Sequence, residues 1–236
     1  MVEAARLHRG RDRHDRGRTL IEGPNLLGEA LANDVIPETV FALSVDRETS
    51  SLAELHGFEL ITVDDRALRR VAGTKTPRGP VGVIEIPAAR TNDAPGLLIA
   101  WGVSDPGNVG TLIRTAAGFG WDFGHTTGTA DPWSPKVLRA GSGGHFRIGI
   151  RTVESVASLK TDGYVAVATI VADGTAPAEL APGRFAVLIG EEASGLPPDV
   201  VAESEVAVTI PLPGGQESLN AAIAAGIILY ELSKPR

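Results

Sequence analysis

The sequence of 236 residues contains no cysteine. This absence excludes disulfide bridges, thiolate nucleophiles and cysteine-ligated zinc, and it suits a reducing compartment. Aromatic residues are also scarce, at 5% of the chain, so few rings are present to stack on nucleotide bases. The composition therefore excludes catalysis by a cysteine thiol. It also indicates that aromatic stacking on bases contributes little to any recognition of nucleic acid.

Long apolar runs are missing as well. The longest, residues 221–230, is about half of the ~20 residues that a membrane span needs. The N-terminal segment MVEAARLHRGRDRHDRGR has no apolar core and does not read as a secretory signal. With 43% apolar and 22% charged residues, the chain has the composition of a soluble globular protein. We expect a cytoplasmic protein of one large or two modest domains, with no membrane association and no metal.

The net charge of −7 conceals a local excess of positive charge. Residues 1–18 hold six arginines against three acidic residues. Such an arm can neutralise several phosphates by counterion release while the rest of the molecule stays acidic. A solvated, disordered terminus explains the same feature equally well.

The rest of the chain alternates between strand-like and helix-like segments, which indicates an α/β arrangement. In the first half we expect a helix over 19–32, with Pro24 in its first turn, and strands at 40–45, 59–63 and 80–86. In the second half we expect strands at 97–103, 164–171, 184–190 and 207–213. The stretch 87–96 reads as a linker. The expected parts are a basic N-terminal arm (1–18), a small α/β domain (19–88) and a larger domain (96–236).

The last helix, from residue 217 onward, is apolar on nearly all sides. A helix of this kind must be covered, either by its own domain or by a second subunit.

Three loop motifs in the second half carry candidate chemistry. The first, SDPGNVGTLIR, follows a buried strand and opens a helix, where unpaired backbone N–H groups can hold an anion. The second, GEEASGL, follows a strand and places a glycine loop where open α/β sheets bind ligands. The third, IPLPGGQESLN, leads into the last helix. Each also has an ordinary interpretation: a helix start, a turn with solvated acids, and a helix cap.

Arg114 stands out because it interrupts the apolar series of its helix. A guanidinium on a helix of the buried type is costly unless it meets an anion or a carboxylate. The alternative is an arginine that reaches solvent or forms a structural ion pair.

Taken together, the motifs N-x-G-x-x-x-R, G-x-E-x-x-G-L and I-P-L-x-G-x-x-x-S-L-N occur in this order over about 115 residues. This pattern resembles the SpoU, or TrmH-like, RNA 2′-O-ribose methyltransferases of the SPOUT superfamily. The segment DPWSPKVLRAGSGGHFRI is similar to the stretch between the first two motifs of that family. LIEGPNLLGEAL and TKTPRGPVGVIEI resemble the small substrate-binding domain that many members carry. The resemblance covers nearly the whole chain.

The resemblance implies a fold, a cofactor and a reaction. The fold is a C-terminal SPOUT-type knotted parallel-sheet domain, preceded by a small α/β substrate-binding domain. Members bind S-adenosylmethionine in a trefoil knot and work as homodimers. The reaction is methyl transfer to a ribose 2′-hydroxyl of structured RNA, and the additional N-terminal domain favours ribosomal over transfer RNA. By motif position, the implied cofactor contacts are Leu188, Gly190, Ile210, Leu212 and Leu219.

The implied catalytic residues are Arg114, Asn108, Glu192, Ser218 and Asn220. Arg114 matches the catalytic arginine of the family. A guanidinium is a poor base, so clamping a phosphate and orienting the hydroxyl is its more plausible role. The other four residues would hold Arg114 and the ribose in place. Glu191 occupies a variable position and is not expected to take part.

If the substrate is RNA, contacts to phosphates and to shape are expected to dominate. The candidates are the basic residues of the arm and of the segment before the second motif: Arg9, Arg11, Arg13, Arg16, Arg18, Lys136 and Arg139.

Two other function classes remain open. A Rossmann-type oxidoreductase should show G-x-G-x-x-G with an acid about 20 residues later, which the glycines here do not provide. A non-catalytic RNA-binding protein on the same scaffold should have lost the arginine or the cofactor glycines, and both are present in this chain.

Overall fold

The computed structural model describes residues 1–77, 79–89 and 93–234. The chain divides into two compact units, and each is treated separately. The N-terminal unit combines Met1–Ala88 with Asp131–Arg147, and the C-terminal unit combines Ala89–Ala130 with Ile148–Arg236.

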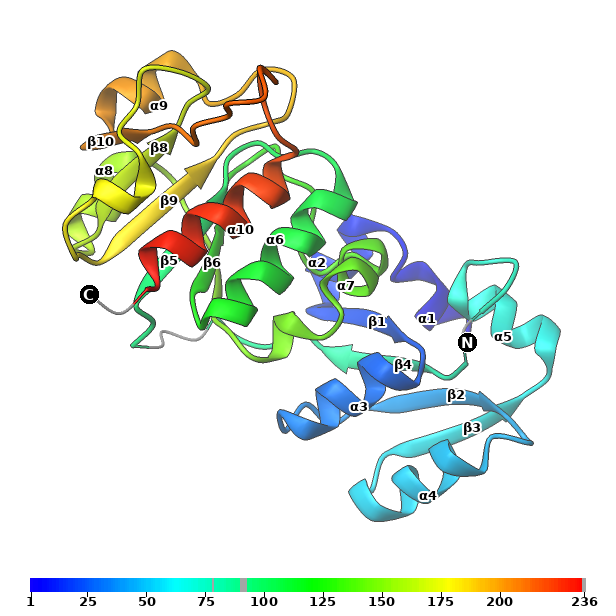
Figure 1. The fold of residues 1–236 in the computed structure, drawn as a ribbon. Coiled ribbons are helices and arrows are strands. Elements are labelled where there is room, and N and C mark those ends of the chain that lie inside the picture. Colours follow the sequence, from blue (N-terminus) through cyan, green and yellow to red (C-terminus); the bar gives the residue numbers. More distant parts are fainter. Residues whose placement is uncertain (78, 90–92, 235–236) are drawn as a thin grey trace. The chain divides into compact units, whose positions relative to one another are not determined.

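The N-terminal unit is built on a four-stranded sheet of order β1-β4-β2-β3 (Figure 1). Strand β4 pairs antiparallel with both β1 and β2, whereas β2 and β3 are parallel. The strands are β1 (Arg18–Glu22), β2 (Thr39–Leu43), β3 (Glu59–Val63) and β4 (Val81–Glu85). The helices are α1 (Val2–Arg6), α2 (Gly10–Arg16), α3 (Pro24–Ala32), α4 (Arg47–His56), α5 (Asp65–Ala72), α7 (Pro135–Gly141) and the short 3-10 helix η1 (Gly144–Phe146).

The expected helix over 19–32 is wrong at its start, because residues 18–22 form strand β1. Three consecutive residues of β1, Thr19 to Ile21, are buried and pair with β4. Gly23 then turns the chain at a φ of 95°, and Pro24 begins α3 as its first residue. Tertiary pairing with β4, which local periodicity cannot report, decides the strand.

The residues expected to form a basic arm are folded instead into α1 and α2. Ala4 and Leu7 are buried in a core cluster with Leu68 and Val71 of α5. Arg13 of α2 is only 4% exposed. Apolar positions between the arginines thus fix this segment to the N-terminal unit.

A second difference concerns residues 131–147, which belong to the N-terminal unit rather than to the larger expected domain. Leu138 and Phe146 share a core cluster with Leu27 of α3. The Asp131 carboxylate accepts a hydrogen bond from Arg13 Nε at 2.9 Å. Such a buried pair is costly to break, because removing one partner leaves an uncompensated charge.

The C-terminal unit contains a six-stranded parallel sheet of order β10-β8-β9-β5-β6-β7 (Figure 1). Its strands are β5 (Gly96–Ala100), β6 (Asp122–His125), β7 (Ile150–Thr152), β8 (Val165–Thr169), β9 (Phe185–Ile189) and β10 (Val206–Val208). Its helices are α6 (Pro106–Phe119), α8 (Val156–Thr161), α9 (Pro198–Glu203), α10 (Ala221–Leu232) and the 3-10 helix η2 (Pro177–Glu179).

The fold confirms the expected parallel α/β sheet of the second half. Strands β5 and β9 are fully buried, as expected for near-continuous apolar runs. The expected strand at 207–213 is shorter, because β10 ends at Val208 and the Pro- and Gly-rich loop follows. Helices α6 and α10 pack side by side (Figure 1). None of the helices in the described part of the chain is long and apolar enough to cross a membrane.

The burial of one histidine in the N-terminal unit predicts that the stability of the fold decreases at acidic pH. His145 Nε2 donates to the Pro132 carbonyl at 2.9 Å, and its Nδ1 is buried with no hydrogen-bond partner among the described residues. Burial lowers the pKa of His145 from 6.5 to about 4. Below pH 6.5 the unfolded chain takes up a proton that the folded chain refuses until about pH 4. Stability is therefore lost as the pH falls through this window.

We expect His145→Gln, which can keep the hydrogen bond to Pro132, to remove much of this pH dependence. The free energy of unfolding of the native chain should fall between pH 7.5 and pH 5 by about 2 kcal/mol more than that of the variant. Urea unfolding at both pH values measures the difference, with His56→Gln on α4 as the control. An unchanged pH dependence in His145→Gln would contradict this assignment.

Candidate functional site

The three sequence motifs meet in the C-terminal unit, where the first borders and the other two line a cavity of about 800 Å³. The cavity lies at the carboxyl ends of β8, β9 and β10, the edge at which parallel sheets bind ligands. The wall is formed mainly by the segments 169–172, 189–196 and 216–219. Its size is in the range of natural small-molecule sites.

Four of the five expected cofactor residues line this cavity: Gly190, Ile210, Leu212 and Leu219. The fifth, Leu188, is fully buried in the core of the unit and is not part of the wall. Leu188 lies within β9, whereas the cavity lies at the carboxyl end of this strand, where Ile189 and Gly190 line it.

Gly190 is required by the close approach of two backbone segments. A Cβ at this position would lie 2.3 Å from the Gly195 carbonyl carbon and 2.4 Å from the Leu196 nitrogen. The loop that follows β9 closes on itself through a hydrogen bond from Gly195 N to the Glu191 carbonyl at 2.8 Å. The glycine therefore shapes the loop that lines the cavity.

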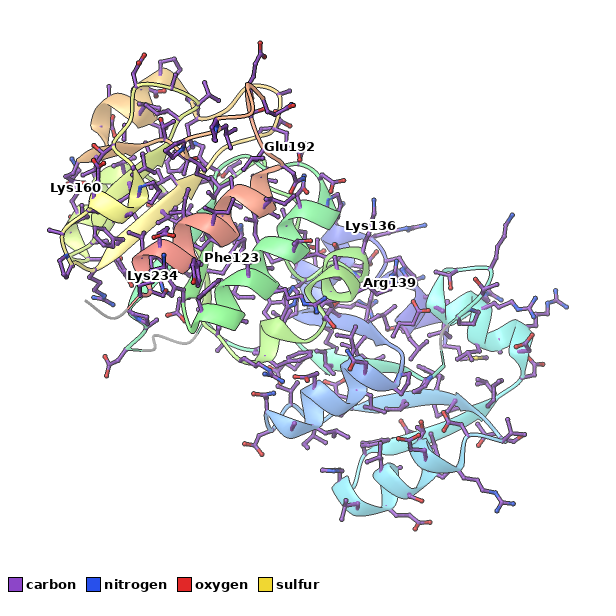
Figure 2. The ribbon with its side chains drawn as sticks, viewed as in Figure 1. Phe123, Lys136, Arg139, Lys160, Glu192 and Lys234 are labelled. Atoms are coloured by element: carbon purple, nitrogen blue, oxygen red, sulfur yellow. The ribbon has the colours of Figure 1, made fainter. Side chains whose placement is uncertain are left out.

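The carboxamide of Asn220 joins all three motifs. Its Nδ2 donates to Asn108 Oδ1 at 3.0 Å and to Glu192 Oε1 at 2.5 Å. Its Oδ1 accepts from Ala222 N at 3.0 Å, which caps the N-terminus of α10. Figure 2 shows Glu192 beside this end of α10. The structure thus brings together three of the five expected catalytic residues.

Glu191 forms a second link that the sequence analysis did not anticipate. Its carboxylate accepts from Ser104 Oγ at 2.7 Å and from Ser194 Oγ at 3.2 Å. Ser104 precedes α6, so Glu191 ties the first motif to the second. Two neighbouring glutamates therefore fasten the same loop to two different segments. The only signal in the sequence is the pair of serines, which is too common to identify a contact.

Arg114 and Ser218 stand apart from this network. Arg114 lies on the exposed face of α6, and within the described part of the chain its side chain has no hydrogen bond or ion pair. Of the two alternatives left open by the sequence, the structure shows an arginine that reaches solvent, because the buried positions of α6 include Val109, Leu112 and Ile113 on another side of the helix. Ser218 lines the cavity with an exposed side chain. Both are thus accessible to a ligand.

Most of the expected RNA contacts carry carboxylate partners within the N-terminal unit. Arg16 pairs with Glu3, Arg18 with Glu38, Arg139 with Glu22 and Arg11 with Asp15. Arg13 differs most from the expectation, because it is buried against Asp131 and has no surface to offer a phosphate. Arg9 and Lys136 are exposed, and no ion pair of either is found within the described ranges. Lys136 and Arg139 both project from α7 (Figure 2).

Comparisons with known proteins match both units. Residues 96–230 match the family model described as the SpoU rRNA methylase family. Residues 2–82 match the model described as the MRM3-like substrate binding domain, so that the match includes α1 and α2.

Similar proteins extend over nearly the whole chain. The Bacillus subtilis protein named 23S rRNA (guanosine(2553)-2′-O)-methyltransferase RlmP is 33% identical over 234 residues, which is 96% of this chain and 93% of the relative. The mitochondrial rRNA methyltransferase 3 of Xenopus laevis is 29% identical and covers 98% of this chain and 72% of its own length. The structure of the SpoU methyltransferase AviRb from Streptomyces viridochromogenes with AdoMet has a TM-score of 0.86 at 25% identity, covering 98% of this chain and 96% of that one.

The double role of Asn220 predicts different effects for two substitutions. Asn220→Ala removes both the cap of α10 and the links to Asn108 and Glu192, and should lower the free energy of unfolding by about 1–2 kcal/mol. Asn220→Asp keeps an acceptor for the amides of α10 but loses the donor and adds a charge beside Glu192.

Hydrogen exchange separates the two roles. Amides in the first turn of α10 should exchange faster only in Asn220→Ala, and amides of residues 190–196 should exchange faster in both variants. Equal protection of residues 190–196 in Asn220→Asp and in the native chain would show that the hydrogen bonds of Asn220 to Asn108 and Glu192 do not stabilise this loop.

Proposed function

The chain belongs to the SpoU rRNA methylase family, and from this premise we propose that it methylates a ribose 2′-hydroxyl of structured RNA with S-adenosylmethionine as the methyl donor. The observation that carries the proposal is the meeting of the family's three motifs at one cavity. Ribosomal RNA is the favoured substrate, because the relatives from Bacillus subtilis and Xenopus laevis are both named as rRNA methyltransferases.

The cavity suits S-adenosylmethionine in its chemistry. Apolar side chains of Ile210, Leu212 and Leu219 can enclose an adenine, and the exposed main chain of the Gly190 loop offers donors and acceptors. The structural relative AviRb is described in complex with AdoMet. When bound, this cofactor supplies an electrophilic methyl group on a sulfonium centre.

The residues of the chain align the acceptor hydroxyl with that methyl group. Arg114 is assigned to hold a phosphate of the RNA and to orient the 2′-hydroxyl, since a guanidinium donates hydrogen bonds and has no acceptor. The hydroxyl oxygen would bond to the methyl carbon as the carbon–sulfur bond of the sulfonium breaks and leaves a neutral thioether, and the hydroxyl proton would pass to water. Asn108, Glu192 and Asn220 position the loops, and Ser218 at the cavity wall is placed to contact the ligand.

The finer features that the family resemblance implies are part of the same proposal. The segments 190–196 and 209–220 are assigned to a trefoil knot. We assign the enzyme to the cytoplasm and assign no metal to the reaction.

An apolar stripe on α10 supports a homodimer. Ile223, Ile227 and Tyr230 are 57%, 37% and 56% exposed, and their spacing of four and three residues puts them on one helix face. An exposed apolar stripe of this kind is typical of an interaction surface. A second copy of the chain is the partner we assign to it.

Methyl transfer from labelled S-adenosylmethionine to RNA tests the proposed reaction. Label should enter ribosomal RNA and should resist alkaline hydrolysis at the modified site. Arg114→Gln should lower the rate by about 100-fold or more while cofactor binding stays intact, because the substituted group orients the hydroxyl and does not line the cavity.

Arg114→Lys serves as a matched variant that keeps the charge without the planar fork, and it should remain well below the native rate. Absence of label in every RNA fraction, with cofactor and RNA both bound, would contradict the enzymatic function and indicate a non-catalytic RNA-binding protein.

The dimer assignment predicts a change of mass in solution. The native chain should sediment at twice 24.6 kDa, and Ile227→Glu should reduce this to one chain by placing a charge in the interface. Leu55→Glu on α4, also at an exposed apolar position, is the control and should stay dimeric. A native protein that sediments as a single chain would contradict the assignment.

A further inference from the structure

Helix α5 of the N-terminal unit presents two contrasting faces. Leu68, Val71 and Ala72 are buried and fix the helix to the core cluster that also contains Leu7. The outer face carries Arg66, Arg69 and Arg70, which are all exposed. The outer arginines therefore take no part in the packing of α5 against the core.

The outer arginines belong to two rows along the helix, one with an attractive pair of charges and one with a repulsive pair. In one row, Asp65 and Arg69 are four residues apart and form an ion pair. In the other row, Arg66 and Arg70 are also four residues apart but carry like charges, which destabilises a helix. Neither has a hydrogen bond or ion pair in the part of the chain that the structure describes.

The position of Arg66 adds to this cost. It is the second residue of α5, and a cation in the first helical turn opposes the helix dipole. Helix stability therefore does not explain the Arg66–Arg70 row. An anion bound across both guanidinium groups would offset the repulsion between them.

Two further cations flank the C-terminal end of the row. Gly73 ends α5 with a φ of 67°, and a Cβ there would lie 2.7 Å from the His8 ring, so the loop between α1 and α2 lies against this end. The His8 ring nitrogen Nε2 makes a 2.8 Å hydrogen bond with the carbonyl of Val71. Arg9 follows His8 and Lys75 lies two residues after Gly73, and both are exposed without an ion pair among the described residues.

We propose that the surface formed by Arg9, Arg66, Arg70 and Lys75 is the docking surface on which the N-terminal unit holds the phosphate backbone of its RNA substrate. The inference rests on the proposed function and names the surface that delivers RNA to the enzyme. It differs from a contact by the N-terminal segment as a whole, because Arg11, Arg13 and Arg16 are engaged with carboxylates.

An RNA backbone fits this surface better than a lipid surface does. A membrane-binding helix needs apolar side chains beside its cations, and the apolar face of α5 is occupied by the core. The chain has a net charge of −7, so four cations that have no ion pair among the described residues are a local attraction for a polyanion. Spaced cations on a rigid helix match a regular series of phosphates.

The test compares two double variants of the full-length protein that remove the same charge. Arg66→Gln with Arg70→Gln neutralises the unpaired row. Arg47→Gln with Arg69→Gln removes two exposed arginines, one on α4 and one in the paired row of α5. The probe is an unmodified transcript of large-subunit ribosomal RNA, and its dissociation constant is measured over a range of salt concentrations. Thermal unfolding of each variant confirms the fold.

The Arg66/Arg70 variant should bind the transcript about tenfold more weakly near physiological salt, and its plot of log K against log salt should be shallower by about 1.5. The Arg47/Arg69 variant should stay within about twofold of the native protein. Equal losses in both variants, or no loss in the first, would overturn the proposal.

Binding of S-adenosylmethionine and methyl transfer are measured in parallel to keep the two proposals apart. A native protein that binds RNA through Arg66 and Arg70 but transfers no methyl group would refute the enzymatic function and leave the docking surface standing. A native protein that methylates RNA, with the Arg66/Arg70 variant equal to it in affinity and rate, would refute the docking surface alone.

Discussion

The hydrogen bonds of the Asn220 carboxamide are the interaction on which the candidate site depends. One side chain caps α10 through its oxygen and fixes Asn108 and Glu192 through its nitrogen. A carboxamide is suited to this position because it offers a donor and an acceptor on the same rigid group. A carboxylate would lose the donor, and a hydroxyl could not reach three segments at once. The cavity wall therefore depends on a residue that also begins the last helix.

The parallel sheet makes that convergence possible. Strand β9 lies between β8 and β5, so loops from distant parts of the sequence reach the same edge. Glu191 and Glu192 then tie the loop after β9 to Ser104 on one side and to Asn220 on the other. Adjacent residues with separate partners hold the loop more firmly than either contact would alone. A ligand in the cavity meets walls that are already ordered, which lowers the entropic cost of binding.

In the N-terminal unit, the fold separates basic residues that are neighbours in the sequence. Arginines that read in sequence as one basic arm are divided by folding into buried, paired and free groups. Arg13 is used to anchor the segment at Asp131, and Arg16 and Arg18 meet carboxylates. Among the described residues of this unit, Arg9, Arg66, Arg70 and Lys75 have no ion pair, and Arg66 and Arg70 lie on α5. Net charge and local sequence could not distinguish these groups, because pairing depends on which acids are brought near by the fold.

Through the resemblance of its three loop motifs to the SpoU family, the sequence alone indicated the reaction class and the cofactor, and it named four residues that line the cavity: Gly190, Ile210, Leu212 and Leu219. It also determined the parallel strands of the second half, whose apolar runs are long enough to read. Only the tertiary structure decided that residues 18–22 are a strand, that residues 131–147 join the N-terminal unit, and that Leu188 belongs to the core. It alone revealed the exposure of Arg114 and the contacts of Glu191. These features depend on pairing and burial between residues far apart in the chain, and no local pattern encodes them.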